Sequence, residues 1–90
     1  MADLGRVNFG AALKSAREEA GILQAAFAER ADLDPSYVSL LENNRKSPTL
    51  TVYFRICDVL GIKPSALMRR VEEMPPPIAK KPKGRKKPAR

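Results

Sequence analysis

The sequence predicts an all-α protein with a compact domain of five helices. Three observations support this prediction. Apolar residues recur at helical spacing along residues 8–74, glycine and proline mark the breaks between these segments, and a hydrophobic fraction of 43% is enough for a small helical core. We expect residues 1–7 to form a flexible leader and residues 75–90 to form a Pro-rich, disordered basic tail.

Charge separates the domain from the tail. Residues 1–74 contain ten Lys/Arg and ten Asp/Glu, whereas residues 75–90 contain seven Lys/Arg and no acid, so the tail holds the whole net charge of +7. Such an arm can bind DNA phosphates through counterion release, or an acidic protein surface. The predicted phosphate contacts are Lys80, Lys81, Lys83, Arg85, Lys86, Lys87 and Arg90.

The first predicted helix runs from a cap at Asn8 to about Ala20. Gly21 then supplies the left-handed residue that commonly ends a helix. The apolar face of this helix consists of Phe9, Ala12, Leu13 and Ala16.

Two short helices separated by a tight turn follow. The second helix begins at Leu23 or Gln24, and the third covers residues 35–42, with Asp34 as its cap and Pro35 at its first position. Asp32 stands where a left-handed turn residue is required. Val38 and Leu41 of the third helix are expected to point inward. This pattern is typical of a helix-turn-helix, in which the second of the two helices enters the DNA major groove.

Two further helices complete the domain. The fourth covers residues 49–60 and ends at Gly61, and the fifth begins at Pro64. The buried stripe predicted for the fourth helix is Leu50, Tyr53, Ile56, Cys57 and Leu60. A second apolar surface is left over, and because a small domain should not bury both surfaces, we assign the second to a twofold dimer interface. The predicted interface residues are Phe54, Leu67, Met68 and Val71.

From Leu13 to Leu67 the chain resembles the Cro/C1-type (XRE-family) helix-turn-helix domains, which have the lambda repressor-like fold. The residues that support the resemblance are Arg17, Gly21, Gln24, Ala28, Leu33, Tyr37, Val38, Ser39, Leu41, Glu42, Asn43, Pro48, Leu60, Gly61 and Ile62. The segment LDPSYVSLLENNRKSPTL is also similar to the corresponding segment of controller proteins of restriction–modification systems.

The resemblance implies roles for individual residues. Arg17 and Glu42 correspond to a structural ion pair between the first and third helices, and Gln24 to a glutamine that braces the third helix and touches the DNA backbone. The implied DNA-binding residues are Gln24, Pro35, Ser36, Tyr37, Ser39, Leu40, Asn44, Arg45 and Lys46. The chain departs from the family at Leu23, where a Ser or Thr cap is usual, and the base-facing positions lack the Arg and Gln side chains that read guanine and adenine in two contacts.

The sequence therefore predicts a bacterial, homodimeric transcription regulator, such as a repressor or controller protein, that binds a palindromic double-stranded DNA operator. No enzyme chemistry is expected, because the chain has no histidine, metal-ligand cluster or phosphate-binding loop, and no cofactor is predicted. Two alternatives are an antitoxin-type interaction module and an architectural nucleoid protein. RNA polymerase and a toxin are further candidate partners. A single cysteine and the lack of a long apolar run favour a cytoplasmic, nucleoid-associated protein and no membrane partner.

Overall fold

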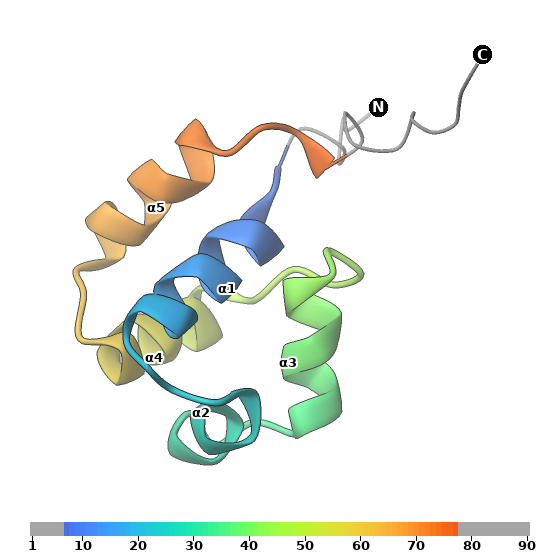
Figure 1. Cartoon of the computed structure of the whole chain (residues 1–90), viewed down its shortest axis with the longest axis vertical. Coiled ribbons are helices and arrows are strands. Elements are labelled where there is room, and N and C mark those ends of the chain that lie inside the picture. The colour runs from blue at the N-terminus through green and yellow to red at the C-terminus, as the bar shows by residue number, and fades with distance from the viewer. Residues whose placement is uncertain (1–6, 78–90) are drawn as a thin grey trace.

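The computed structural model describes residues 7–77 and contains five α-helices (Figure 1). They are α1 (Phe9–Glu19), α2 (Gln24–Arg30), α3 (Pro35–Glu42), α4 (Leu50–Leu60) and α5 (Pro64–Glu73). No strand occurs within the described residues, so the predicted all-α class is confirmed. Most of the predicted leader and most of the predicted basic tail lie outside the described residues.

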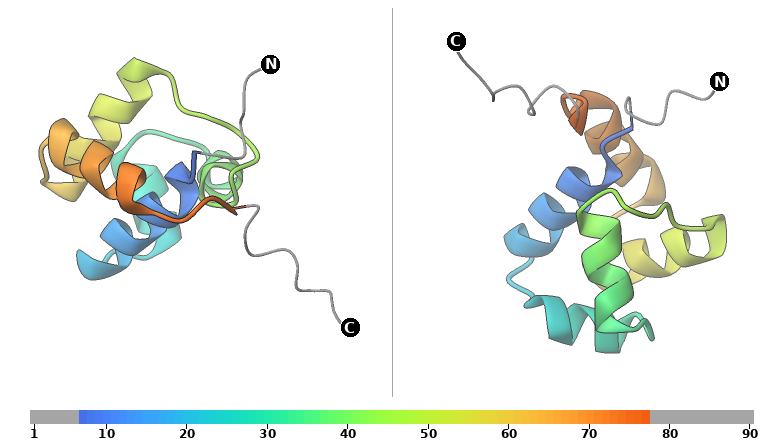
Figure 2. Two further views of the ribbon diagram at one scale, coloured as in Figure 1. Left: turned by 90° about the horizontal axis from the view of Figure 1, so that it is seen from above. Right: turned by 90° about the vertical axis from the view of Figure 1, so that its right-hand side faces the viewer.

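Helix α1 occupies the middle of the arrangement. It packs against α3 on one side and against α5 on the other, while α2 packs against α3 and α4 against α5 (Figures 1 and 2). The position of α3 is therefore set mainly by α1 and α2, the two helices against which it packs most extensively.

The helix boundaries follow the predicted local signals. Asn8 Oδ1 accepts a hydrogen bond from Ala11 N at 3.1 Å, and Asp34 Oδ1 accepts one from Ser36 N at 3.0 Å. Gly21 and Gly61 have φ of 72°, and Asp32 has φ of 58°, as expected for left-handed residues. Leu23 makes no side-chain cap, which agrees with the predicted loss at this position.

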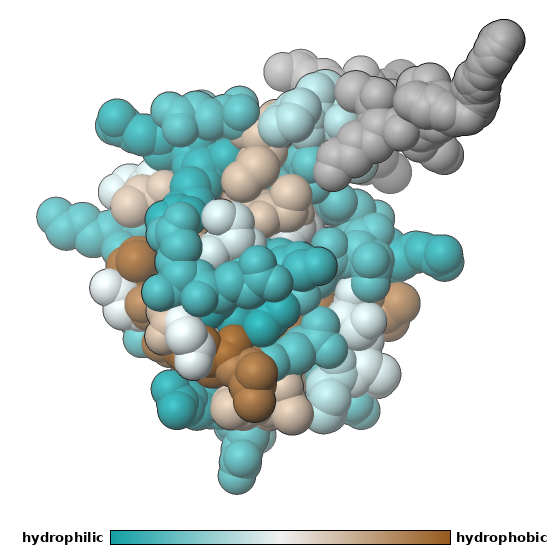
Figure 3. All heavy atoms as spheres, viewed as in Figure 1, coloured by the Kyte–Doolittle hydropathy of each residue, from teal (hydrophilic) through white to brown (hydrophobic). Residues whose placement is uncertain are grey.

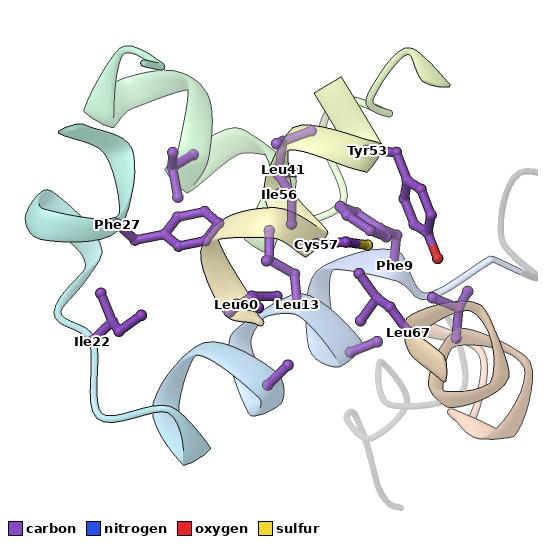
Figure 4. Packing of buried hydrophobic residues seen from close by; sticks show 14 of the residues in the cluster. Phe9, Leu13, Ile22, Phe27, Leu41, Tyr53, Ile56, Cys57, Leu60 and Leu67 are labelled. Carbon is purple, nitrogen blue, oxygen red and sulfur yellow. The ribbon is translucent and has the colours of Figure 1, made fainter. Parts of the chain in front are cut away.

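The core joins all five helices (Figure 4). The predicted inward residues of α1 and α3 are buried, and so are Tyr53, Ile56, Cys57 and Leu60 of α4. Burial raises the pKa of the Cys57 thiol, in keeping with a small core residue rather than a reactive one.

Three predictions about apolar residues were wrong. Leu50 is 74% exposed because it is the first residue of α4 and lies beyond the end of the packed stripe. Leu67 and Val71 were assigned to a dimer interface, but Leu67 is fully buried and Val71 nearly so within the protomer. The reason is that α5 turns these two residues toward α1 and α4, so the small domain buries part of the second apolar surface as well. Of the four predicted interface residues, only Phe54 and Met68 are exposed.

Gly10 allows α1 and α3 to approach closely, which the local sequence does not predict. A Cβ atom at this position would lie 2.3 Å from the backbone oxygen of Glu42 and 2.8 Å from that of Leu41. Only glycine permits this approach without a shift of one helix away from the other. The C-terminal end of α3 therefore rests directly on the start of α1.

None of the helices within residues 7–77 is long and apolar enough to cross a membrane. The face of the molecule seen in Figure 3 is mainly hydrophilic, with apolar residues exposed in small separate areas.

Candidate nucleic-acid interface

Helices α2 and α3 form the predicted helix-turn-helix. The turn between them passes through left-handed Asp32, and its backbone is held by a hydrogen bond from Leu33 N to Ala28 O at 2.8 Å. Arg55 of α4 also contacts the turn, since its Nη1 donates a hydrogen bond to Ala31 O at 3.2 Å. These contacts fix the angle between the two helices.

The inner face of α3 is locked by a buried ion pair. Arg17 Nε donates to Glu42 Oε2 at 2.6 Å and Arg17 Nη2 donates to Glu42 Oε1 at 3.1 Å, while Arg17 Nη1 donates to Ile22 O at 2.8 Å. The side chains of Arg17 and Glu42 are 9% and 5% exposed. The hydrogen bond to Glu42 raises the pKa of the Arg17 guanidinium, so this guanidinium stays charged. The structural ion pair implied by the family resemblance is thus present.

Gln24 supports the same carboxylate. Its Nε2 donates to Glu42 Oε1 at 3.1 Å, so the first residue of α2 is tied to the last residue of α3. The predicted bracing role of Gln24 is confirmed, and the side chain is only partly buried. Its predicted contact with DNA stays a prediction.

The outer face of α3 has little fixed chemistry. Pro35 and Ser36 are exposed, and Tyr37, Ser39 and Leu40 are partly exposed. Ser36 Oγ donates to Asp34 Oδ1 at 3.0 Å and Ser39 Oγ accepts from Asn43 Nδ2 at 3.4 Å, so both serine hydroxyls already have an internal partner. The outer face offers a partner the hydroxyls of Ser36, Tyr37 and Ser39, with the aliphatic side chains of Pro35 and Leu40.

A basic turn follows α3. Arg45 and Lys46 are exposed, and Arg45 N donates to Leu40 O at 2.8 Å, which holds the turn against the end of the helix. Residues 44–47 border a shallow depression together with Val7 and Phe9. The two cations therefore lie in the turn that directly follows the C-terminal end of α3.

Asn44 was predicted to contact DNA, but its side chain serves the fold. Its Oδ1 accepts from Gly10 N at 2.9 Å and its Nδ2 donates to Asn8 Oδ1 at 2.8 Å. The left-handed conformation predicted at this position is confirmed by φ of 60°. Because both polar atoms face the start of α1, Asn44 positions the turn. Its predicted contact with DNA stays a prediction.

A second exposed surface lies on the other side of the turn. Phe54 is 53% exposed and Met68 is 44% exposed, and Leu50 stands near them at the start of α4. Leu50 and Met68, but not Phe54, line a groove; its other lining residues are Val7, Phe9, Ser47, Pro48, Tyr53 and Val71. We name Leu50, Phe54 and Met68 the apolar patch.

No group of three or more potential metal ligands occurs among the residues that the structure describes. The seven predicted phosphate contacts of the tail lie outside residues 7–77.

Comparison with known proteins agrees with this geometry. Residues 13–67 match the model of the helix-turn-helix family. The chain belongs to the XRE-type helix-turn-helix family. The matched residues, 13–67, are the same residues over which the sequence resembles the Cro/C1-type domains.

Relatives in this family include a controller protein. The control protein C.MunI of a Mycoplasma species is 35% identical over 69 residues, which is 76% of this chain and 93% of that protein. The match to longer relatives is partial: the chain spans 12% of the transcriptional regulator RamB of Mycobacterium tuberculosis and 41% of the immunity repressor protein of Bacillus phage phi105. These relatives are named as regulators and repressors, not as enzymes.

Solved structures of family members have the same fold. The clp gene regulator ClgR of Corynebacterium glutamicum superposes with a TM-score of 0.70 at 30% identity, covering 79% of this chain and 91% of that one. The restriction–modification controller protein C.AhdI of Aeromonas hydrophila gives a TM-score of 0.65 at 31% identity, covering 74% and 98%.

Proposed function

We propose that the chain is a sequence-specific regulator of transcription that binds double-stranded DNA as a homodimer on a palindromic operator. The observation that supports this most directly is the contrast between the two faces of α3. One face is locked to α1 and α2 through Glu42, and the other is open to solvent beside Arg45 and Lys46. This is the arrangement expected of a helix that lies in the major groove while the adjacent turn contacts phosphates.

The outer face of α3 predicts how bases are read. Ser36 and Ser39 can each donate or accept one hydrogen bond, and Leu40 suits the methyl group of thymine. No side chain there can make a bidentate contact to guanine or adenine. We therefore expect direct readout to be weak and DNA shape, water and backbone contacts to supply much of the specificity.

The apolar patch is our proposed dimer surface. Leu50, Phe54 and Met68 are exposed large apolar residues on α4 and α5, and such side chains are usually covered in an assembly when they lie together. A twofold interface here would present two copies of α3 to one operator. We expect Met68→Asp combined with Phe54→Asp to give a monomer in sedimentation equilibrium.

A matched control separates loss of the interface from general surface charge. Leu23→Asp replaces one apolar residue by an acid at a position that is 77% exposed and is the N-cap of α2, outside the apolar patch. This control should remain dimeric. If the patch variant also remains dimeric, the patch is not the interface.

Selection from a random duplex library tests the proposed function. Full-length protein and a version ending at Met74 would be used at two salt concentrations. We expect both to enrich one palindromic site, with the shorter version binding more weakly and with a smaller salt slope, since up to seven phosphate contacts are lost. Binding without any enriched sequence, dependent on the tail alone, would contradict the proposal and favour an architectural DNA-binding protein.

A further inference from the structure

Two asparagine side chains connect the turn after α3 to the start of α1. Asn44 Nδ2 donates to Asn8 Oδ1 at 2.8 Å, and Gly10 N donates to Asn44 Oδ1 at 2.9 Å. Asn8 is 1% exposed, although asparagine usually lies at the surface. The two asparagines are 36 positions apart in the sequence, so their contact holds the turn to a distant helix. We name Asn8 and Asn44 the asparagine pair.

The orientation of both amides follows from their partners. Asn8 Nδ2 donates to the carbonyl oxygen of Pro75 at 2.8 Å, and a carbonyl can only accept. Asn8 Oδ1 therefore faces Ala11 N and Asn44 Nδ2, and it accepts from both. Asn44 Oδ1 in turn accepts from Gly10 N. Neither amide can turn over without losing these hydrogen bonds.

The side chain of Asn44 does more than its backbone requires. Asn44 has φ of 60°, a left-handed conformation that glycine adopts without strain. Glycine could close the same turn, but its backbone would be held only by the hydrogen bonds along the turn. The asparagine side chain adds two bonds to the start of α1, and so restricts the residue immediately before Arg45 and Lys46.

Arg45 and Lys46 are two exposed cations in succession. To contact neighbouring phosphates, both must be directed at the same duplex, and a mobile turn would have to be ordered when DNA binds. Part of that ordering is present in the free protein, because the asparagine pair holds residue 44 and Arg45 N donates to Leu40 O at 2.8 Å. Preorganisation of this kind raises affinity without any new contact to the ligand.

We infer that Asn8 and Asn44 are positioning residues for DNA binding, which hold the turn after α3 in the conformation in which Arg45 and Lys46 contact phosphates. This inference rests on the proposed function. It does not require either amide to touch DNA, since the pair acts through the two cations. The expected consequence is energetic coupling: loss of the asparagine bonds should weaken binding only while the cations are present.

A double-mutant cycle in the full-length protein tests the inference. One change is Asn44→Gly, which accepts the left-handed conformation but loses both bonds to α1; the other is Arg45→Ala combined with Lys46→Ala. Affinity for the duplex selected from the random library would be measured by fluorescence anisotropy. We expect Asn44→Gly to weaken binding about fivefold with the cations present and less than about twofold without them. Equal losses in the two backgrounds would overturn the inference.

A matched control removes a hydrogen bond elsewhere in the fold. Tyr53→Phe loses the bond from Tyr53 Oη to Pro64 O at 2.6 Å, which lowers stability without a change in the turn. Its effect on binding should be the same with and without Arg45 and Lys46. Coupling as large as that of Asn44→Gly would mean that any loss of stability disturbs the turn, and would overturn the positioning role.

Asn8→Ser gives a second test that leaves the sequence of the turn unchanged. Serine can still cap α1 but lacks the amide that joins Pro75 and Asn44, so the same coupling to the cations is expected. In the free proteins, the Arg45 amide hydrogen should exchange about tenfold faster in both variants than in wild type by NMR, because its bond to Leu40 O opens more often. Unchanged exchange in both variants would show that the asparagine pair does not hold the turn, and would overturn the inference.

The outcomes distinguish this inference from the proposed function. If wild-type protein selects an operator and the variant without the two cations binds it equally well, the inference alone fails, because there is no phosphate contact to position. If no version selects a sequence, the proposed function fails.

Discussion

Helix α1 takes part in two ion pairs of similar geometry and very different setting. Arg17 meets Glu42 of α3 at 2.6 Å with both side chains almost fully buried, whereas Glu19 meets Arg70 of α5 at 2.7 Å with side-chain exposures of 63% and 33%. Both pairs contain two hydrogen bonds between guanidinium and carboxylate. From the distances alone, the two ion pairs would be expected to contribute equally to the stability of the fold. The difference in burial indicates that breaking the pair between α1 and α3 costs much more stability than breaking the pair between α1 and α5.

The largest loss in the free energy of unfolding is expected from Glu42→Gln. The change keeps the shape of the side chain but leaves the buried Arg17 guanidinium without an opposite charge, which typically costs about 3 kcal/mol. That is a large share of the stability of a domain of this size. Urea unfolding followed by circular dichroism would measure it, with the exposed neighbour of Arg17, Glu18→Gln, as control. Equal midpoints for the two variants would show that the buried pair of Arg17 and Glu42 adds no more stability than an exposed unpaired carboxylate next to Arg17.

Gly10→Ala should have the next largest effect. Alanine favours a helix over glycine by about 1 kcal/mol, but here its Cβ would meet the backbone oxygen of Glu42, so we expect a net loss of about 1–3 kcal/mol. Ala11→Gly, at the next and more exposed position, gives the propensity effect alone. A Gly10→Ala protein more stable than wild type would show that α1 can move away from α3 without loss of stability, and would contradict a required close approach at Gly10.

Tyr53→Phe examines how α5 is attached. Tyr53 Oη donates to Pro64 O at 2.6 Å, and its loss should cost about 1 kcal/mol. Burial, with a smaller contribution from Cys57, raises the pKa of Tyr53 from 10 to about 12. The stabilisation linked to this shift is complete below pH 10 and is lost as pH rises toward 12. Wild-type protein should therefore lose stability more steeply than the variant over that interval in pH-dependent unfolding; parallel curves would contradict this.

The smallest effect is expected from Glu19→Gln. The hydrogen bond from Arg70 lowers the pKa of Glu19 below its ordinary value of 4.5, so the carboxylate stabilises the fold above that pH and ceases to do so as pH falls through its lowered pKa. Solvent and salt screen this exposed pair. At neutral pH the variant should match wild type in thermal unfolding at 0.5 M salt. A loss as large as that of Glu42→Gln would show that exposure does not distinguish the two pairs.

Much of the candidate site could be predicted from local sequence. The cap at Asp34, the left-handed residues Asp32 and Gly61, and the ion pair of Arg17 with Glu42 are each specified by residue type and spacing, or by the family resemblance. Each was found where expected. The DNA contacts assigned to the outer face of α3 and to Arg45 and Lys46 stay predictions.

The sequence by itself determined where the helices begin and end, because caps, glycines and prolines act within a few residues of the backbone that they constrain. Only the tertiary structure decided which apolar side chains are covered by another helix. Leu67 and Met68 are adjacent apolar residues of α5, but the packing of α5 on α1 and α4 buries Leu67 and leaves Met68 exposed. The same holds for Gly10 and for the bond from Asn8 to Pro75, since each depends on a partner more than 30 positions away. Contacts of that kind are set by how helices cross, and local sequence does not encode the crossing.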